Sequence, residues 1–342
     1  MSTSENQRRP RVIDIALQAG VSTATVDRVL NGRPGVRAKT VKKVLDAMDR
    51  LGASTARPRV IPSVPAGLTI DVVLAEGAGF ANDVLSSELK TYCERVGFSY
   101  RQTFSKRMVP EALRRALDDC LERGTDGVIV QPLDHPLVRD AIARLANAGV
   151  PVVCILTDLP ASDRLAYVGL DNRAAGRAAG LLTGRLCSDP GDLALFAGGE
   201  LYRSHEEREA GFRSVIRDSF QRLGVLATFS SGDDPHRIYV MARDLLKDCD
   251  NLRGICCIGG GNRGIEKALL ESRRQNQIVY CAFNLTPLTR NGLLTGTFDV
   301  VVHQDMERAA HTAVDSLVHH FEGKAPSPGT IPTELIMVEN LR

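Results

Sequence analysis

The sequence predicts a small all-α domain of helix-turn-helix type, followed by an α/β body of two doubly wound, parallel-sheet lobes. Apolar residues recur at helical spacing over 12–51, three prolines interrupt the chain within 58–65, and short β-rich runs alternate with amphipathic stretches from Leu68 onward. A chain of 342 residues has room for a small headpiece and a larger body. We therefore expect a headpiece at 1–52, a linker at 53–67 and a body at 68–342.

The first two helices are expected to meet at a tight turn around Gly20. Glycine adopts the left-handed backbone that such a corner needs, and Ser22 is a good N-cap for the second helix. That helix has one apolar face, formed by Val26, Val29 and Leu30. A third helix should begin near Ala38 and bury the stripe Val41, Val44, Leu45, Met48 and Leu51.

The opposite face of the second helix is polar and short-chained. It holds Thr23, Ala24, Asp27, Arg28 and Asn31. A face of this kind suits a helix that lies in the major groove of DNA. The alternative is a small three-helix bundle that only packs against the rest of the protein.

The charge distribution favours the DNA interpretation. Residues 1–60 hold 12 Lys and Arg against 5 Asp and Glu, a balance of +7, whereas the whole chain carries +2 and the remainder therefore −5. A basic end on an acidic body indicates a nucleic-acid partner for that end alone. No stretch approaches the ~20 apolar residues of a membrane span, and no leader-like apolar run follows Met1.

The eight cysteines show no zinc-ligand or C-x-x-C spacing. Cys154, Cys256, Cys257 and Cys281 fall within apolar, strand-like runs. We expect core thiols of a protein in a reducing cytoplasm, with no disulfide framework and no metal site.

From Leu68 onward, strands and helices alternate, which predicts parallel sheets with helices on both faces. The expected strands are LTIDVVLA, GVIVQ, VPVVCIL, DLALFAG, GVLATFS, GICCIGG, IVYCAFN and TGTFDVVV. The expected helices include 83–95, 111–123, 137–148, 174–187, 205–220 and 237–247. One small sheet does not conveniently hold so many strand–helix units, so we expect two α/β lobes. The ligand site of two such lobes is expected at the carboxyl ends of their strands.

The headpiece run IALQAGVSTATVDRVLNG, with GVRAKTVKKVLDAMDRLG after it, resembles the lactose-repressor (LacI/GalR) family of bacterial transcription regulators. The resemblance implies that Thr23, Ala24 and Arg28 read base edges, and that Ser22, Thr25 and Asn31 contact phosphates. Asp27 departs from the family, which usually has a small hydroxyl residue there. It could accept a bond from a cytosine amino group or orient Arg28.

The body resembles the type I periplasmic sugar-binding proteins through YVGLDNRAAGRAAG, SHEEREAGFRSVI, IGGGNRGIEKAL and FDVVVHQDMERAAHTAV. The resemblance implies ligand contacts from Phe80, Asn82, Asp158, Asp171, Arg208, Asn262, Asn284 and Gln304. Singly, Asp171, Asn172 and Asn262 could equally be helix N-caps. Asn284 stands where an Asp is common, and with Arg208 it leaves an acidic sugar derivative possible.

A competing hypothesis comes from Gly259–Gly264, which satisfies G-x-G-x-x-G between a strand and a helix. A dinucleotide site needs a carboxylate at the end of the next strand, but Ala282-Phe283-Asn284 has none. No Ser/His/Asp or Cys/His arrangement indicates catalysis. We therefore expect neither an enzyme nor a cofactor. A transport binding protein would share the body but lack the headpiece.

The combined prediction is a cytoplasmic, sugar-responsive regulator that binds double-stranded operator DNA as a homodimer. No leucine heptad helix follows TELIMV, which favours a dimer over a tetramer. The family's linker carries a hinge helix with a Leu in the minor groove, and Pro62 falls about there. With Pro58 and Pro65 beside it, that helix should be weaker, shorter or absent.

Overall fold

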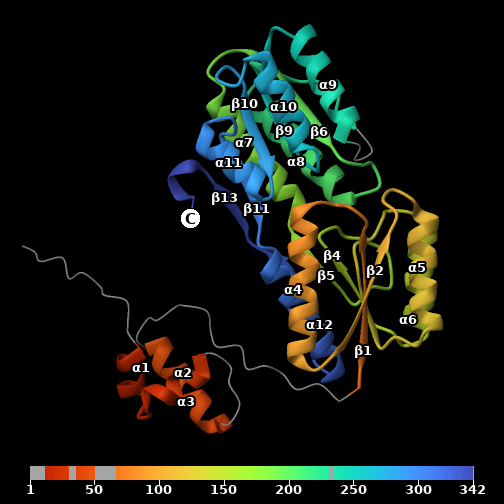
Figure 1. Cartoon of the computed structure of the whole chain (residues 1–342), viewed down its shortest axis with the longest axis vertical. Coiled ribbons are helices and arrows are strands. Elements are labelled where there is room, and N and C mark those ends of the chain that lie inside the picture. Colours follow the sequence, from red (N-terminus) through yellow and green to blue (C-terminus); the bar gives the residue numbers. More distant parts are fainter. Residues whose placement is uncertain (1–11, 31–35, 51–66, 231–234, 342) are drawn as a thin grey trace, which may run out of the picture. The chain divides into compact units, whose positions relative to one another are not determined.

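The computed structural model describes residues 12–30, 36–50, 67–230 and 235–341. The chain divides into two compact units, 1–63 and 64–342 (Figure 1). Asn31 and the three prolines of the linker, Pro58, Pro62 and Pro65, lie outside the described residues. The predictions that concern them therefore stay predictions.

The headpiece consists of α1 (Val12–Ala19), α2 (Thr23–Leu30) and α3 (Ala38–Arg50). Gly20 has φ 66°, and the Val21 N–H donates to the carbonyl of Ala16 over 3.0 Å, so the predicted left-handed corner is present. Val26 and Val29 are buried with Ile15, Val44 and Met48, as their helical spacing predicted.

The first lobe of the body contains a parallel sheet in the order β12-β5-β4-β3-β1-β2. Its strands are β1 (Thr69–Ala75), β2 (Ser99–Ser105), β3 (Gly127–Val130), β4 (Val152–Ile155), β5 (Ala166–Leu170) and β12 (Thr330–Ile331). One face is covered by α4 (Phe80–Val96) and α12 (Met306–Phe321), and the other by α5 (Pro110–Glu122) and α6 (Pro136–Asn147) (Figure 1).

The second lobe contains a sheet in the order β13-β11-β10-β9-β6-β7, with β8 paired to β6. Its strands are β6 (Gly191–Ala197), β7 (Leu223–Val225), β8 (Phe229–Ser230), β9 (Leu252–Cys257), β10 (Val279–Phe283), β11 (Val300–Gln304) and β13 (Thr333–Ile336). Its helices are α7 (Asn172–Leu186), α8 (Arg203–Ser219), α9 (Pro235–Asp248), α10 (Asn262–Ser272) and α11 (Pro287–Thr295), and a short 3-10 turn, Val338–Asn340, follows β13. The predicted parallel sheets are confirmed, and the edge strand β13, which runs antiparallel to β11, is the exception among the described strand pairs.

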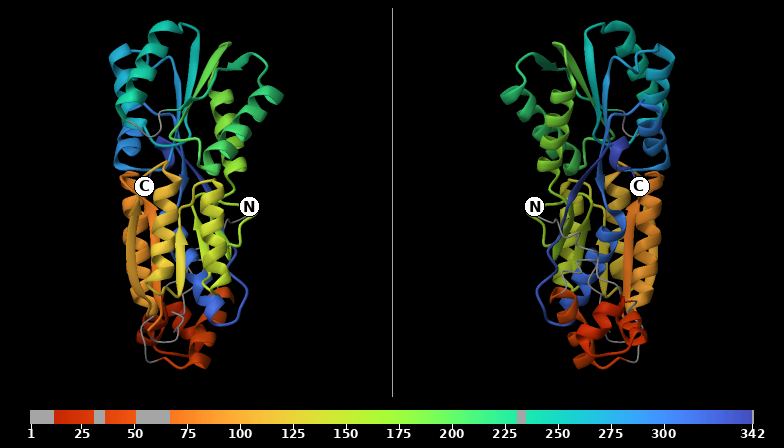
Figure 2. Two further views of the ribbon diagram at one scale, coloured as in Figure 1. Left: turned by 90° about the vertical axis from the view of Figure 1, so that its right-hand side faces the viewer. Right: turned by 90° about the vertical axis from the view of Figure 1, so that its left-hand side faces the viewer.

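The chain crosses between the lobes at three places, seen in side view in Figure 2. It crosses at Asp171 between β5 and α7, at Asp305 between β11 and α12, and at Pro332 between β12 and β13. Because β5 and β11 both end at a crossing, the carboxyl edges of both sheets face the junction of the lobes. The Ser204 N–H bonds Thr157 Oγ1 there over 3.1 Å.

Each lobe has its own apolar core, built from strand residues and the helices against them. All eight cysteines are free thiols, and seven of them are buried. Burial raises the pKa of Cys154 to about 12, so this thiol is protonated and chemically quiet at neutral pH. The prediction of core thiols is confirmed. Within the described parts of the chain, no helix combines the length and apolarity that a bilayer crossing requires.

Candidate functional site: the junction of the two lobes

Arg208 is placed at the lobe junction by unusually close packing of α7 against α8. A Cβ atom on Gly176 would collide with the Arg208 carbonyl, and one on Gly211 with the Arg173 carbonyl. Gly180 faces the Phe212 carbonyl in the same way. The two helices therefore approach backbone to backbone, which fixes the start of the Arg208 side chain.

The Arg208 guanidinium is buried, and its hydrogen-bond partners among the described residues are all neutral groups. Its Nε donates to Asn172 Oδ1 over 2.8 Å and its Nη1 to the Ile258 carbonyl over 2.9 Å. Its Cζ lies 4.4 Å from the centre of the Phe283 ring, a cation–π contact. Burial lowers the pKa of Arg208 to about 10, so the group stays charged at neutral pH.

His205 lies one helical turn before Arg208 and is kept neutral. Burial, and then the positive charge of Arg208, lower the pKa of His205 to about 3. Its Nδ1 lies 3.2 Å from the Gly199 carbonyl, a distance that suits an Nδ1–H donor. The junction therefore has a permanent cation beside a neutral imidazole.

Two amide side chains at neighbouring strand ends have unused hydrogen-bonding atoms. Asn284 follows β10 with φ 66°, and its N–H donates to the Val302 carbonyl over 2.8 Å. Its buried Oδ1, and the buried Nε2 of Gln304 at the end of β11, have no hydrogen-bond partner within the described residues. Unsatisfied buried amides are costly, and a bound polar molecule would satisfy them.

Asn262 is the first residue of α10, and its Oδ1 accepts a bond from the Tyr280 hydroxyl over 3.1 Å. The N-cap is Gly261, so the alternative that Asn262 is an N-cap is wrong. Gly261 has φ 117°, and a Cβ there would collide with Ile238. Backbone geometry and packing thus account for the glycine of a G-x-G-x-x-G pattern, without any need for a dinucleotide.

The predicted ligand-contacting residues Phe80, Asn82, Asp158 and Asp171 differ in burial and in hydrogen-bond partners. Asn82 is buried and donates to Gln131 Oε1 over 3.0 Å, whereas Phe80, two residues earlier, is 49% exposed. Asp158 is paired with Arg164, with Nε–Oδ1 at 2.5 Å. Asp171 is exposed and caps α7 by accepting the Ala174 N–H over 2.8 Å, so its N-cap interpretation is confirmed.

Two residues of this constellation were not among the predicted contacts. Asn172 is not an N-cap; it is buried and holds Arg208 on one side and the Tyr167 hydroxyl on the other, at 2.9 Å. The face of the Phe283 ring packs against the guanidinium of Arg208. The sequence signal that could have identified Asn172 was its position at a strand-to-helix corner. Its hydrogen bond with Arg208, 36 positions later, could not be predicted from the sequence.

In the headpiece, the described part of the predicted DNA-contacting face is exposed. Thr23, Ala24, Asp27 and Arg28 are exposed on α2. Ser22 Oγ accepts the Thr25 N–H over 3.1 Å and lies 2.8 Å from Thr25 Oγ1, which caps the helix. The helix thus presents its polar face outward from the headpiece core.

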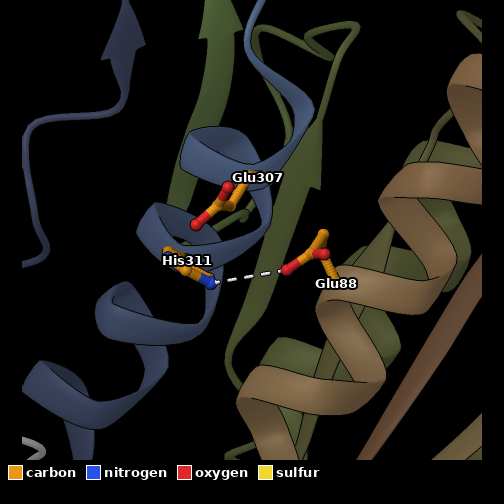
Figure 3. A group of neighbouring side chains, drawn as sticks. All are labelled: Glu88, Glu307 and His311. Carbon is orange, nitrogen blue, oxygen red and sulfur yellow. Dashed lines mark ion pairs between the residues drawn. The ribbon is translucent and has the colours of Figure 1, made fainter. Parts of the chain in front are cut away.

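A second cluster of ionisable groups joins α4 to α12 (Figure 3). Glu88, Glu307 and His311 place their ligand atoms within 4.8 Å of one another, and His311 Nε2 lies 3.8 Å from Glu88 Oε2. The His311 ring stacks on Tyr92 at 4.0 Å between centroids. The cluster is an ion pair between helices when the imidazole is protonated, with a second carboxylate beside it.

The headpiece has the form of a helix-turn-helix domain with an exposed polar helix face, and the two-lobed body has the form of a binding protein. The chain belongs to the family of the periplasmic binding protein domain, which matches residues 75–325, and residues 12–53 match the lacI family of bacterial regulatory proteins. It is 32% identical over 216 residues to an uncharacterized HTH-type regulator of Streptomyces limosus (61% of this chain, 58% of the relative). It is 28% identical over 210 residues to the repressor PurR of Actinobacillus pleuropneumoniae (60% of each chain). The chain thus spans little more than half the length of these relatives.

Solved structures share the fold of the body. The glucose-galactose binding protein GanP of Geobacillus stearothermophilus superposes with a TM-score of 0.75 at 22% identity, covering 81% of this chain and 99% of GanP. A solute binding protein of Burkholderia graminis, in complex with D-arabinose, superposes with a TM-score of 0.76 at 22% identity, covering 80% of this chain and 96% of that protein. At this identity the likeness establishes the fold alone.

Proposed function

We propose that this chain is a transcriptional repressor whose affinity for operator DNA is controlled by a sugar or sugar-like effector held between the two lobes. It acts in the cytoplasm as a homodimer, needs no cofactor and catalyses no reaction. The headpiece is formed by residues 1–52, the linker by 53–67 and the effector-binding body by 68–342.

The observation that carries this proposal is the set of unused polar atoms at the lobe junction. Arg208 has five N–H donors and makes two hydrogen bonds, while Asn284 Oδ1 and Gln304 Nε2 make none within the described residues. All three lie at the carboxyl edge of one sheet, where α/β folds bind ligands. Asn262, Asp171, Asp158, Asn82 and Phe80 are proposed to complete the site.

Occupation of this site would bias the closure of the lobes. Gln304 directly precedes the crossing at Asp305, and Asn172 directly follows the crossing at Asp171. A ligand that bonds both segments stabilises the closed arrangement over the open one by its differential affinity. In a dimer, that change would alter how the two headpieces engage two half-sites, which couples effector to DNA.

In the headpiece, we propose that Thr23, Ala24 and Arg28 contact base edges and that Ser22, Thr25 and Asn31 contact phosphates. The exposure of Ser22, Thr23, Ala24 and Arg28 supports the assignment, and Thr25 is half-buried. Asp27 is proposed to orient Arg28 or to accept from a cytosine amino group.

The proposal is tested by selecting binding sites for the full chain from a random duplex library, and then screening sugars for thermal stabilisation. We expect a two-fold symmetric consensus, and an effector that raises the melting temperature and changes affinity for that consensus. Arg208→Gln should abolish the effector response and retain the consensus. An effector response that persists in Arg208→Gln would place the effector site elsewhere.

A further inference from the structure

The charge of Arg208 is not neutralised by any carboxylate in the described parts of the chain. Its hydrogen-bond acceptors are an amide oxygen of Asn172 and the carbonyl of Ile258, and its third neighbour is the ring of Phe283. The side chain belongs to a residue only 6% exposed. A buried guanidinium without a counter-ion loses hydration that neutral acceptors restore only in part.

The carboxylates of this region have other roles. Asp158 is engaged by both Nε and Nη2 of Arg164, at 2.5 and 2.8 Å. Asp171 is exposed and caps α7. The groups that raise the pKa of Arg208 against the effect of burial are Tyr167, Cys256 and Cys257, which are neutral at physiological pH. No acidic side chain among the residues that the structure describes is therefore placed to offset the guanidinium.

We propose that the effector is an anionic sugar derivative, a sugar acid or a sugar phosphate, whose oxyanion binds Arg208 while its hydroxyls bind Asn284 and Gln304. This inference rests on the proposed function and narrows its effector class. The oxyanion supplies the counter-charge that the chain itself lacks. Arg208 keeps three N–H donors for it, since two of its five are used within the protein.

The end of β10 explains why a neutral sugar fits less well. Asn284 directly follows Phe283, whose ring packs against the Arg208 guanidinium. A carboxylate at position 284 would bring a negative charge to the same strand end and would favour a neutral ligand there. An amide brings no charge, so the site remains cationic.

The decisive variant is therefore Asn284→Asp, which keeps the size of the side chain and adds the missing charge. Calorimetry on the full chain compares D-glucuronate, D-gluconate and D-glucose 6-phosphate with D-glucose, and D-ribose 5-phosphate with D-ribose. We expect anionic forms to bind about tenfold or more tightly than their neutral parents, because a charge-assisted bond is gained. Carboxylate and phosphate members of the panel separate the two oxyanion sources.

In Asn284→Asp, the preference for anions should fall about tenfold or reverse. Arg208→Gln should lose it, and Arg217→Gln, a change at an exposed surface arginine, should keep it. A second readout does not depend on sugar stereochemistry. Inorganic phosphate at constant ionic strength should raise the melting temperature of the native chain more than chloride does, and that difference should vanish in Arg208→Gln and in Asn284→Asp.

Equal or tighter binding of the neutral parents by the native chain would overturn the inference and leave the proposed function intact. An equal phosphate effect in all variants would also overturn it. If no compound of either class binds and phosphate has no specific effect, both the inference and the proposed effector site fail together. Native-like unfolding curves for Asn284→Asp and Arg208→Gln show that a lost preference reflects the site.

Discussion

Arg208 Nε donates to Asn172 Oδ1 over 2.8 Å, and this bond joins the first turn of α7 to the second turn of α8. Asn172 lies beside a crossing between the lobes, and Arg208 lies at the carboxyl edge of the second sheet. The bond therefore sets the orientation of the guanidinium relative to the segment that would move in the proposed closure of the lobes. It is a structural prerequisite for the proposed effector site.

Replacing Asn172 by Ala should cost about 1–3 kcal/mol in the free energy of unfolding, because it leaves a buried Arg208 N–H without its acceptor. The same variant should weaken effector binding. Urea unfolding measures the first effect. Asp171→Asn is the matched control: Asn caps helices about as well as Asp, so stability should change little. Equal loss in both variants would show that only the helix start matters.

Gly176→Ala should destabilise the body, because its Cβ would overlap the backbone carbonyl of Arg208 and push α8 away from α7. Overpacking typically costs about 1–3 kcal/mol, and the gain from removing a helical glycine offsets at most about 1 kcal/mol. Thermal unfolding is the measurement. Ala174→Gly, at an exposed position of the same helix, supplies the control for helix propensity alone. A neutral Gly176→Ala would contradict the close approach of the helices.

His205 should make the stability of the body depend on pH. Its pKa is about 3 in the folded chain against 6.5 for an unperturbed imidazole, because burial and Arg208 disfavour the charged form. Below pH 6.5 the unfolded chain therefore takes up a proton that the folded chain does not. The contribution of neutral, buried His205 to the free energy of unfolding is fully present above about pH 6.5. It is lost progressively as the pH falls toward 3.

Chemical unfolding at pH 7 and pH 5 checks this sign. His205→Gln should reduce the loss of stability between these two values by about 1–2 kcal/mol. His236→Gln, at an exposed position, should leave the difference unchanged. A pH dependence that is the same in both variants would mean that another group titrates.

Arg28→Ala should weaken binding to the selected operator by about 1–3 kcal/mol and relax specificity at one base pair, since a base-edge contact is lost. The control is Lys39→Ala, which removes the same charge from an exposed position on α3. The measurement is anisotropy on operator and scrambled duplexes at fixed salt. If Arg28→Ala weakens both duplexes alike, as a lost phosphate contact would, the base-reading role is wrong.

Much of the fold could be predicted because buried segments leave a strong pattern. The runs around Val128, Val153 and Ile255 are wholly apolar, as strands covered on both faces must be. The strand β2 was not predicted: SYRQTFS lies at a sheet edge, is half-exposed along most of its length and so lacks an apolar signature. The antiparallel direction of β13 depends on how the chain returns from the first lobe, which no local pattern encodes.

The candidate site was predictable in its positions but not in its partners. Strand ends of parallel sheets share an edge, so Asn284 and Gln304 could be grouped from the sequence alone. Which groups contact Arg208 could not be read from the sequence, because Asn172, Ile258 and Phe283 come from distant segments. The absence of a carboxylate among these contacts became visible only in the structure.

Control of DNA binding by the effector is tested by measuring the operator affinity of the full chain by fluorescence anisotropy, with and without the tightest-binding member of the sugar panel. The duplex is the consensus from the random library. This compound is expected to change operator affinity by about 5–150-fold, and Arg208→Gln should bind the operator but no longer respond. Operator affinity that stays the same at saturating compound, as shown by calorimetry, would contradict effector control of DNA binding.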